Sequence, residues 1–277
     1  MSDEELLPLL IKNLDELRYR VIRIFYVFGI VFIFLMIFRV QTLDLFGFKF
    51  PFIYPDVYRN TGSQFLALVE SHVLPKGTEI LVFRPTDGVA ADLYLTMFMA
   101  LVISMPYTVL QISRFLNPAL KKSEKDMVKS LVIPASALFA AGSFVGLWLI
   151  APELFIIFNR FDLGLGAVTS MGLMNFVSFL FIYVLTFGLA FELPVIMVAI
   201  TRLGIVNSDY WRKNWRYAVV ASLVFGMIFS PGVTGFTMIV MSVPMMILYF
   251  GGYYFARRIE KHRMEQAVQD NKDAFSN

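Results

Sequence analysis

The chain has 277 residues, of which 58% are hydrophobic and 16% charged, with a formal net charge of +3 and no cysteine. A soluble domain is about 45–50% apolar and about 25% charged, so this composition excludes a single soluble globular domain. Because the chain has no cysteine, disulfides, thiolate metal sites and cysteine nucleophiles are excluded. The sequence also lacks the basic stripe interleaved with aromatic residues that would indicate nucleic-acid binding. Because the apolar residues occur in long blocks, the chain is predicted to be a polytopic membrane protein.

The N-terminal segment, residues 1–20, predicts a cytoplasmic amphipathic helix. Four leucines repeat at spacings of four and three residues: Leu6, Leu10, Leu14 and Leu17. This spacing gives one apolar stripe along a helix, and the acidic start is not that of a secretory signal peptide. One interpretation is an interfacial helix that leads into the first span and carries its acids as solvated surface. The sharper interpretation is that Glu16 is held at the membrane surface to meet a cation.

Six apolar runs follow, at residues 21–38, 89–112, 129–150, 171–200, 217–229 and 234–256. In hydrocarbon the backbone must satisfy its own polar groups, so these runs are expected to be helices. The third is expected to end at Ala151-Pro152. The predicted fold class is therefore an all-α polytopic membrane protein with six transmembrane helices in one domain, residues 21–256. Residues 257–277 are expected to form a cytoplasmic tail.

The lengths of two runs are unusual. The fourth run is about 45 Å long as a helix, so it must tilt, bend or project into water. The fifth has 13 residues, or about 20 Å, which is less than the hydrocarbon thickness of about 30 Å. We expect the last two helices to be short and to form a hairpin that thins the bilayer, with a re-entrant loop as the alternative.

The distribution of Lys and Arg predicts the orientation. Eighteen of the 24 basic residues fall on the side of the two termini and six on the other side. The positive-inside rule therefore places both termini in the cytoplasm. The long first loop, residues 39–88, is then extracytoplasmic and is expected to form a folded cap.

The motifs of common enzymes are missing. The only histidines, His72 and His262, lie outside the predicted spans, which excludes an H-E-x-x-H metal site. The sequence also has no glycine-rich phosphate loop and no G-x-S-x-G turn. We therefore expect no catalytic residues, no metal and no cofactor.

The fourth run contains one acid, Glu192, two residues before Pro194. A carboxylate at mid-span costs about 2.5–3.5 kcal/mol on insertion, whereas one polar tie between helices returns only about 0.6 kcal/mol, so a functional role is favoured. Pro194 removes a backbone hydrogen bond and bends the helix, which with Gly188 predicts a polar notch.

The alternative is a proton- or solute-coupled secondary transporter with Glu192 as relay. That function predicts further polar residues and an internal repeat, and neither is evident. A third possibility is an assembly factor for other membrane proteins.

The end of the second run carries a further pattern of residues: Pro106, Gln111, Phe115, Pro118, Leu120 and Glu124. Pro118 marks a helix boundary, because the residue before a proline disfavours helix. Glu124 lies in an otherwise basic loop. It either pairs with a neighbouring lysine or forms a second carboxylate close to Glu16.

These motifs resemble those of the TatC family, the multi-span receptor subunit of the twin-arginine protein translocase. The pattern ending at Glu124 resembles its second-span signature, NLDELRYR at 13–20 its N-terminal motif, and FGLAFELPV at 187–195 its fourth-span motif. The resemblance covers nearly the whole chain. Three departures stand out: Asn13 replaces the usual histidine, the first loop is longer than typical, and the turn SPGVTGFT at 230–237 lacks an acidic residue.

The resemblance implies the sites and partners. The signal-peptide site it implies comprises Glu16, Glu124, Phe115, Arg18, Gln111 and Pro118, and the site for a partner helix comprises Glu192, Pro194 and Gly188. Glu16 and Glu124 would bind the two arginines of a signal peptide on folded cargo. Separately from the resemblance, the proximity of Arg18 to Glu16 in the sequence predicts that Arg18 orients Glu16. Single-span TatA- or TatB-type subunits would dock at Glu192. The implied assembly is a hetero-oligomer with membrane lipids, driven by the proton motive force in the cell membrane of a bacterium or archaeon.

Overall fold

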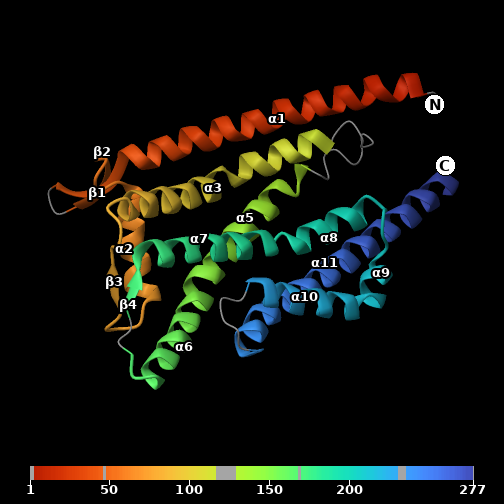
Figure 1. The fold of residues 1–277 in the computed structure, drawn as a ribbon. Coiled ribbons are helices and arrows are strands. Elements are labelled where there is room, and N and C mark those ends of the chain that lie inside the picture. Colours follow the sequence, from red (N-terminus) through yellow and green to blue (C-terminus); the bar gives the residue numbers. More distant parts are fainter. Residues whose placement is uncertain (1–2, 46–47, 117–128, 168–169, 230–234, 277) are drawn as a thin grey trace. The chain divides into compact units, whose positions relative to one another are not determined.

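The computed structural model describes residues 3–45, 48–116, 129–167, 170–229 and 235–276 and is mostly helical (Figure 1). Five of its helices are long and apolar enough to cross a membrane: Leu14–Ile37, Asp87–Phe115, Val132–Gly164, Leu173–Arg202 and Thr237–Lys261. A sixth apolar helix, Trp215–Phe229, is shorter. Crossing by this sixth helix stays a prediction. By its contacts the chain divides into two compact units, residues 1–136 with 143–185 and residues 137–142 with 186–277.

In the first unit, the N-terminal segment and the first span form one unbroken helix, α1 (Asp3–Ile37). It packs along α3 (Asp87–Leu116), which runs in the opposite direction (Figure 1). The C-terminal end of α3 therefore lies at the same end of this unit as the N-terminal half of α1. This arrangement brings two of the sequence motifs to one end of the unit.

The segment between these helices is partly β-structure, which corrects the expectation of an all-α chain. Strands β1 (Phe38–Leu45) and β2 (Phe48–Pro55) pair antiparallel, and both are rich in the β-branched and aromatic residues that favour strands. Helix α2 (Thr61–Val73) follows. Strand β3 (Glu79–Leu81) pairs in parallel with β4 (Ser170–Gly172). A folded cap was expected in this segment, but its strands were not.

A charged contact ties the start of the hairpin to the turn after it. Arg39 Nη1 donates to Asp56 Oδ2 at 3.0 Å. The backbone N–H groups of Arg59 and Tyr58 also donate to this carboxylate. The Arg59 N–H is the main cause that lowers the pKa of Asp56 below its ordinary 3.8, with help from Tyr58 and Arg39. Asp56 therefore stays ionised, and the contact persists, down to the acidity at which this lowered pKa is reached.

Helix α2 packs closely on the start of α3 through a buried polar cluster. Asn60, fully buried, caps α2 by accepting from the Ser63 N–H, and its amide nitrogen donates to Asp92 Oδ2 at 2.5 Å. A Cβ on Gly62 would lie 2.2 Å from Thr96 Oγ1 and 2.4 Å from Asp92 Oδ1, so a larger residue would have to displace these two side chains. The cluster thus gives Asp92 a hydrogen-bonding partner at the end of its apolar helix.

The third apolar run is longer than predicted. Helix α5 (Val132–Phe144) continues through a π-helical turn, η2 (Val145–Ile150), into α6 (Ala151–Gly164). The predicted end at Ala151-Pro152 is wrong, because Pro152 occupies the first turn of α6, where a proline's missing N–H costs nothing. On the π turn, the Trp148 carbonyl is 3.2 Å from His72 Nε2, and the two rings meet edge to face.

The second unit contains the end of α7 (Leu173–Ala190) and all of α8 (Leu193–Arg202), α9 (Ser208–Lys213), α10 (Trp215–Phe229) and α11 (Gly235–Ser276). Helix α11 packs on both α8 and α10. Helix α10, with 15 residues, is short as predicted. The prediction of a short last helix is wrong, since the apolar part of α11 spans 25 residues. It continues into the C-terminal tail, which contains no Gly or Pro to end it.

Candidate functional site

The first candidate site lies on α1 around Glu16. The side chain of Glu16 is 29% exposed, and its Oε1 accepts from Arg20 Nε at 3.0 Å and also from Arg20 Nη2. Arg20 lies one helical turn further along, the spacing at which side chains on a helix meet. Glu16 Oε2 has no partner among the described residues. In the described part of the chain, one carboxylate oxygen is therefore held by Arg20 and the other has no partner.

The structure corrects the predicted role of Arg18. Its side chain is exposed, and the residue that holds Glu16 is Arg20. A side chain two residues away on a helix points to a different face, whereas one four residues away shares the face. The i,i+4 spacing of Glu16 and Arg20 was available in the sequence as the signal for this pair.

The C-terminal end of α3 carries Gln111 and Phe115. Phe115 is half-buried, whereas Gln111 is only 1% exposed, and both of its amide atoms lack a hydrogen-bonding partner among the described residues. Gln111 therefore lies inside the unit and does not present its amide at the surface. Pro118 and Glu124, the other two residues of this motif, lie outside the described residues.

The second candidate site is the interruption between α7 and α8 at Phe191 and Glu192. Helix α7 ends at Ala190 and α8 begins at Leu193, so the break expected from Pro194 is confirmed. Gly188 and Pro194 are buried, and Glu192 is partly exposed. Its Oε1 is shielded from solvent and has no hydrogen-bonding partner in the described part of the chain. A carboxyl oxygen is thus left unsatisfied within the apolar span.

An apolar groove of about 490 Å³ lies in the second unit beside this break. Its lining includes Leu189, Leu193 and Ile196 from the broken helix, Phe225 from α10 and Met245 from α11. Leu189 and Ile196 are more than half exposed. Since the groove is open and almost wholly apolar, it has the chemistry to receive another apolar helix.

Close helix contacts hold this unit together. A Cβ on Gly226 of α10 would lie 2.4 Å from the Met238 carbonyl oxygen of α11, and one on Gly252 of α11 would lie 3.0 Å from Pro194 Cα. Ser222, one turn before Gly226, is also buried. Small residues four apart are a known signal for close helix packing in membranes, so this contact was detectable in the sequence but was not predicted.

The described residues contain no group of three or more His, Asp or Glu side chains arranged to hold a metal ion. The two candidate sites are the carboxylate of Glu16 on α1 and an apolar groove beside the break that carries Glu192. Both have the chemistry of recognition sites for peptides or helices.

Comparison with known proteins agrees with this description. The family of the Sec-independent protein translocase protein (TatC) matches residues 12–244. The protein of that name from Cenarchaeum symbiosum is 34% identical over 250 residues, covering 90% of this chain and 95% of the relative. The one from Deinococcus radiodurans is 29% identical over 251 residues, covering 90% and 85%. A crystal structure of the twin arginine translocase receptor TatC superposes with a TM-score of 0.65 at 23% identity, covering 88% of this chain and 98% of that one.

The fold is that of a polytopic helical membrane protein, and the family match makes it a component of a protein translocase. The family match over residues 12–244, and a relative covered over 95% of its length, identify the family within this class. The chain belongs to the TatC family.

Proposed function

We propose that this chain is the receptor subunit of a twin-arginine translocase, binding the twin-arginine signal peptide of folded cargo and organising the export complex. The observation that carries the proposal is the half-sheltered Glu16, whose Oε2 has no partner within the described residues while Arg20 fixes Oε1. Guanidinium is planar and permanently charged, and its paired N–H groups match carboxylate oxygens. A signal-peptide arginine would bind Oε2 of a carboxylate that Arg20 has already oriented.

The second arginine would be read by Glu124, which the family motif pairs with Phe115, Gln111 and Pro118. Helices α1 and α3 run antiparallel, so this motif begins at the same end of the unit as Glu16. A charge-assisted hydrogen bond contributes roughly 1.5–3 kcal/mol, and exposure reduces that value. Partial shelter beside Phe115 would limit this reduction.

Glu16→Gln and Glu124→Gln are each expected to lower photo-crosslinking to a twin-arginine peptide about five- to tenfold, since each removes the charge from one bond. The matched control is Asp15→Asn, which removes an equal charge from an exposed neighbour on α1 and should leave crosslinking unchanged. A twin-lysine peptide should bind as weakly as the variants. Full crosslinking in both glutamine variants, or an equal loss in Asp15→Asn, would show that these carboxylates do not read the arginines.

The groove beside Glu192 is proposed as the docking site of a single-span subunit. An apolar helix would fill the groove, and a polar side chain on it would satisfy the shielded Glu192 Oε1. In this proposal Gly188 and Pro194, which flank the break, belong to the same docking site as Glu192. The transporter alternative is not favoured, because the chain belongs to a translocase family and, among the described residues, the groove lining contains no ionisable group except the phenol of Tyr249.

Glu192→Leu is expected to weaken docking about threefold to twentyfold, the range set by interhelical hydrogen bonds of about 0.6–1.7 kcal/mol. The measurement is crosslinking of a single-span subunit to a photoprobe at Ile196, which lines the groove and is 54% exposed. A probe at Ile239, equally exposed but outside the groove lining, is the control. Glu192→Gln should retain most of the crosslinking because it keeps hydrogen-bonding capacity. If Glu192→Leu crosslinks as well as the parent, this carboxyl group has no part in docking.

In this proposal both termini face the cytoplasm of a bacterium or archaeon. Residues 1–20 are the cytoplasmic part of α1, residues 21–256 one transmembrane domain, and residues 257–277 a cytoplasmic tail. Residues 39–88 form the extracytoplasmic cap. The chain acts in a hetero-oligomer with TatA- or TatB-type subunits and has no catalytic role of its own.

A further inference from the structure

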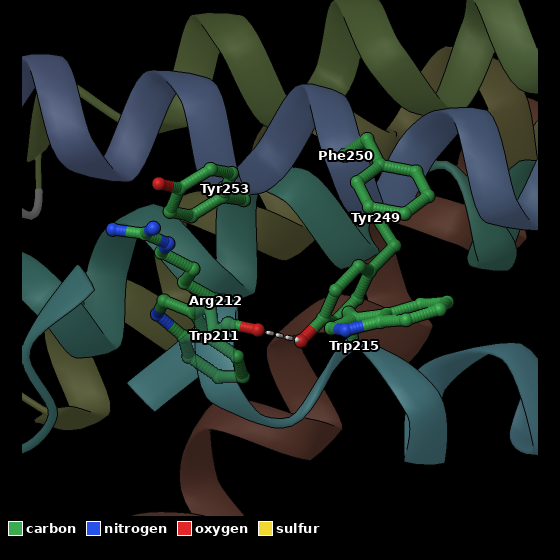
Figure 2. Close-up of a pocket in the computed structure, with 6 residues that line it drawn as sticks. All are labelled: Trp211, Arg212, Trp215, Tyr249, Phe250 and Tyr253. Atoms are coloured by element: carbon green, nitrogen blue, oxygen red, sulfur yellow. Dashed lines mark hydrogen bonds between the residues drawn. The ribbon is translucent and has the colours of Figure 1, made fainter. Parts of the chain in front are cut away.

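A pocket of about 310 Å³ lies in the second unit where α9 meets α10 and α11 (Figure 2). Its lining comprises Trp211, Arg212, Trp215, Tyr249, Phe250 and Tyr253. Two of the chain's three tryptophans are in this lining. None of these residues belongs to the signal-peptide site, and the role proposed for the groove beside Glu192 makes no use of the charge here.

The aromatic part of the pocket is held in place by hydrogen bonds. Trp211 Nε1 donates to Thr201 Oγ1 at 2.9 Å, and the Tyr249 hydroxyl donates to the Trp211 carbonyl at 2.7 Å, the dashed line in Figure 2. The Ser208 N–H donates to Glu260 Oε2 at 2.8 Å and ties the start of α9 to α11. The pocket is therefore a preformed site with a fixed shape.

Positive charge gathers at its rim. A second hollow, of about 740 Å³, shares Arg212 and Trp215 with the pocket and adds Lys213, Arg216 and Asp209. Its three cations and one carboxylate leave a net positive charge. Within the described chain no carboxylate lies at ion-pair distance from any of the three cations. The Arg216 guanidinium instead lies 5.9 Å from the centroid of the Trp215 ring.

The pocket lies at the start of the apolar helix α10. Trp215 is the first residue of the apolar helix α10, and Tyr249 and Tyr253 lie in the apolar part of α11. Basic residues precede α10 directly along the chain. Aromatic rings beside basic side chains at the start of an apolar helix mark the boundary between the membrane and water.

We propose that this pocket binds the phosphate headgroup of an anionic phospholipid. Arg212, which lines both hollows, and Arg216, which lines the adjoining one, would bind the phosphate at the rim of the pocket, since guanidinium matches phosphate oxygens in the same two-bond geometry as carboxylate. The N-terminus of α10 adds favourable partial charge for an anion. Trp215 and Phe250 would pack against the glycerol and the start of the acyl chains. Basic pockets between membrane helices are a recurrent form of lipid recognition. The positive charge of Arg212 in the lining disfavours binding of a cationic choline group among the aromatic rings of the pocket.

The test uses the full chain purified in detergent and native mass spectrometry with added phosphatidylglycerol. One phosphatidylglycerol is expected to stay bound to the parent protein. Each arginine contributes roughly fivefold, so the double variant Arg212→Gln with Arg216→Gln should reduce the apparent affinity for the lipid by at least about tenfold. Trp215→Leu should also weaken retention, because it removes the aromatic ring that forms one wall of the pocket. The matched control is Arg257→Gln with Arg258→Gln, which removes the same charge from exposed residues of α11 outside both hollows.

Three results would overturn the assignment. They are unchanged retention in the Arg212 and Arg216 double variant, an equal loss in the Arg257 and Arg258 control, and equal retention of phosphatidylcholine. A competition arm with inorganic phosphate separates the two sources of the anion. Displacement of the lipid by phosphate at comparable concentration would mean that the pocket binds a free phosphate ion and not a phospholipid.

Discussion

Gly226→Val is expected to disrupt the packing of α10 against α11 and to lower the free energy of unfolding by about 3 kcal/mol or more. Even a bare Cβ at this position would lie 2.3 Å from Ser242 Oγ and 2.4 Å from the Met238 carbonyl oxygen. A backbone carbonyl in a helix cannot rotate away, so α10 and α11 must separate. In a membrane this contact depends on close packing and not on hydrophobic burial, so little compensates for its loss.

The measurement is the midpoint of thermal unfolding in detergent, and the readout is the loss of the monodisperse peak in size-exclusion chromatography. Gly251→Val is the matched control, because a Cβ there would meet nothing within 4 Å. It exchanges the same residue types in the middle of a helix and should stay close to the parent or gain slightly from lower backbone entropy. Equal midpoints for the two variants would show that α10 and α11 do not approach as closely as described.

Gly142→Val is the second substitution with a large expected effect, and it acts on the break at Glu192. A Cβ at Gly142 would lie 2.6 Å from both Cβ and Cγ of Phe191 and 2.7 Å from the Phe187 carbonyl oxygen. Neither contact is the free end of a flexible side chain. The substitution should therefore push the turn at Phe191 away from α5 and cost about 2–3 kcal/mol, near the upper end for overpacking.

The control for Gly142→Val is Ala141→Val, which enlarges an exposed neighbour on the same helix and should cost under about 0.5 kcal/mol. Because the displaced turn carries Glu192, Gly142→Val should also lower crosslinking of a partner helix at Ile196. A Gly142→Val protein as stable as the parent would contradict the packing of α5 on this turn.

The break in the fourth span was predictable because its cause is local. Pro194 lacks the N–H that the helix needs and clashes with the preceding turn, so the interruption follows from one residue. The long apolar helices followed in the same way from composition and the requirement for internal backbone hydrogen bonds in lipid. The short α10 followed from a simple residue count.

Features that depend on context were missed. Pro152 was interpreted as a stop, yet the π turn before it places the proline where its missing N–H costs nothing. Strand β3 depends on pairing with β4, which is far away in the sequence and which spacing alone does not reveal. The β1–β2 hairpin is local, and the aromatic residues of β2 are a signal for a strand that was not used. Arg20 was overlooked for the nearer Arg18, although helix geometry favours the residue four positions away.

The tryptophans divide between the two units, with Trp148 in the first and Trp211 and Trp215 in the second. Replacing Trp148 with Phe leaves a tryptophan fluorescence signal, excited selectively over tyrosine, that comes only from the second unit. Replacing the other two leaves a signal only from the first, centred on the residue whose ring meets His72. The chain therefore carries its own pair of optical reporters, with which the unfolding of each unit can be followed separately without an attached dye.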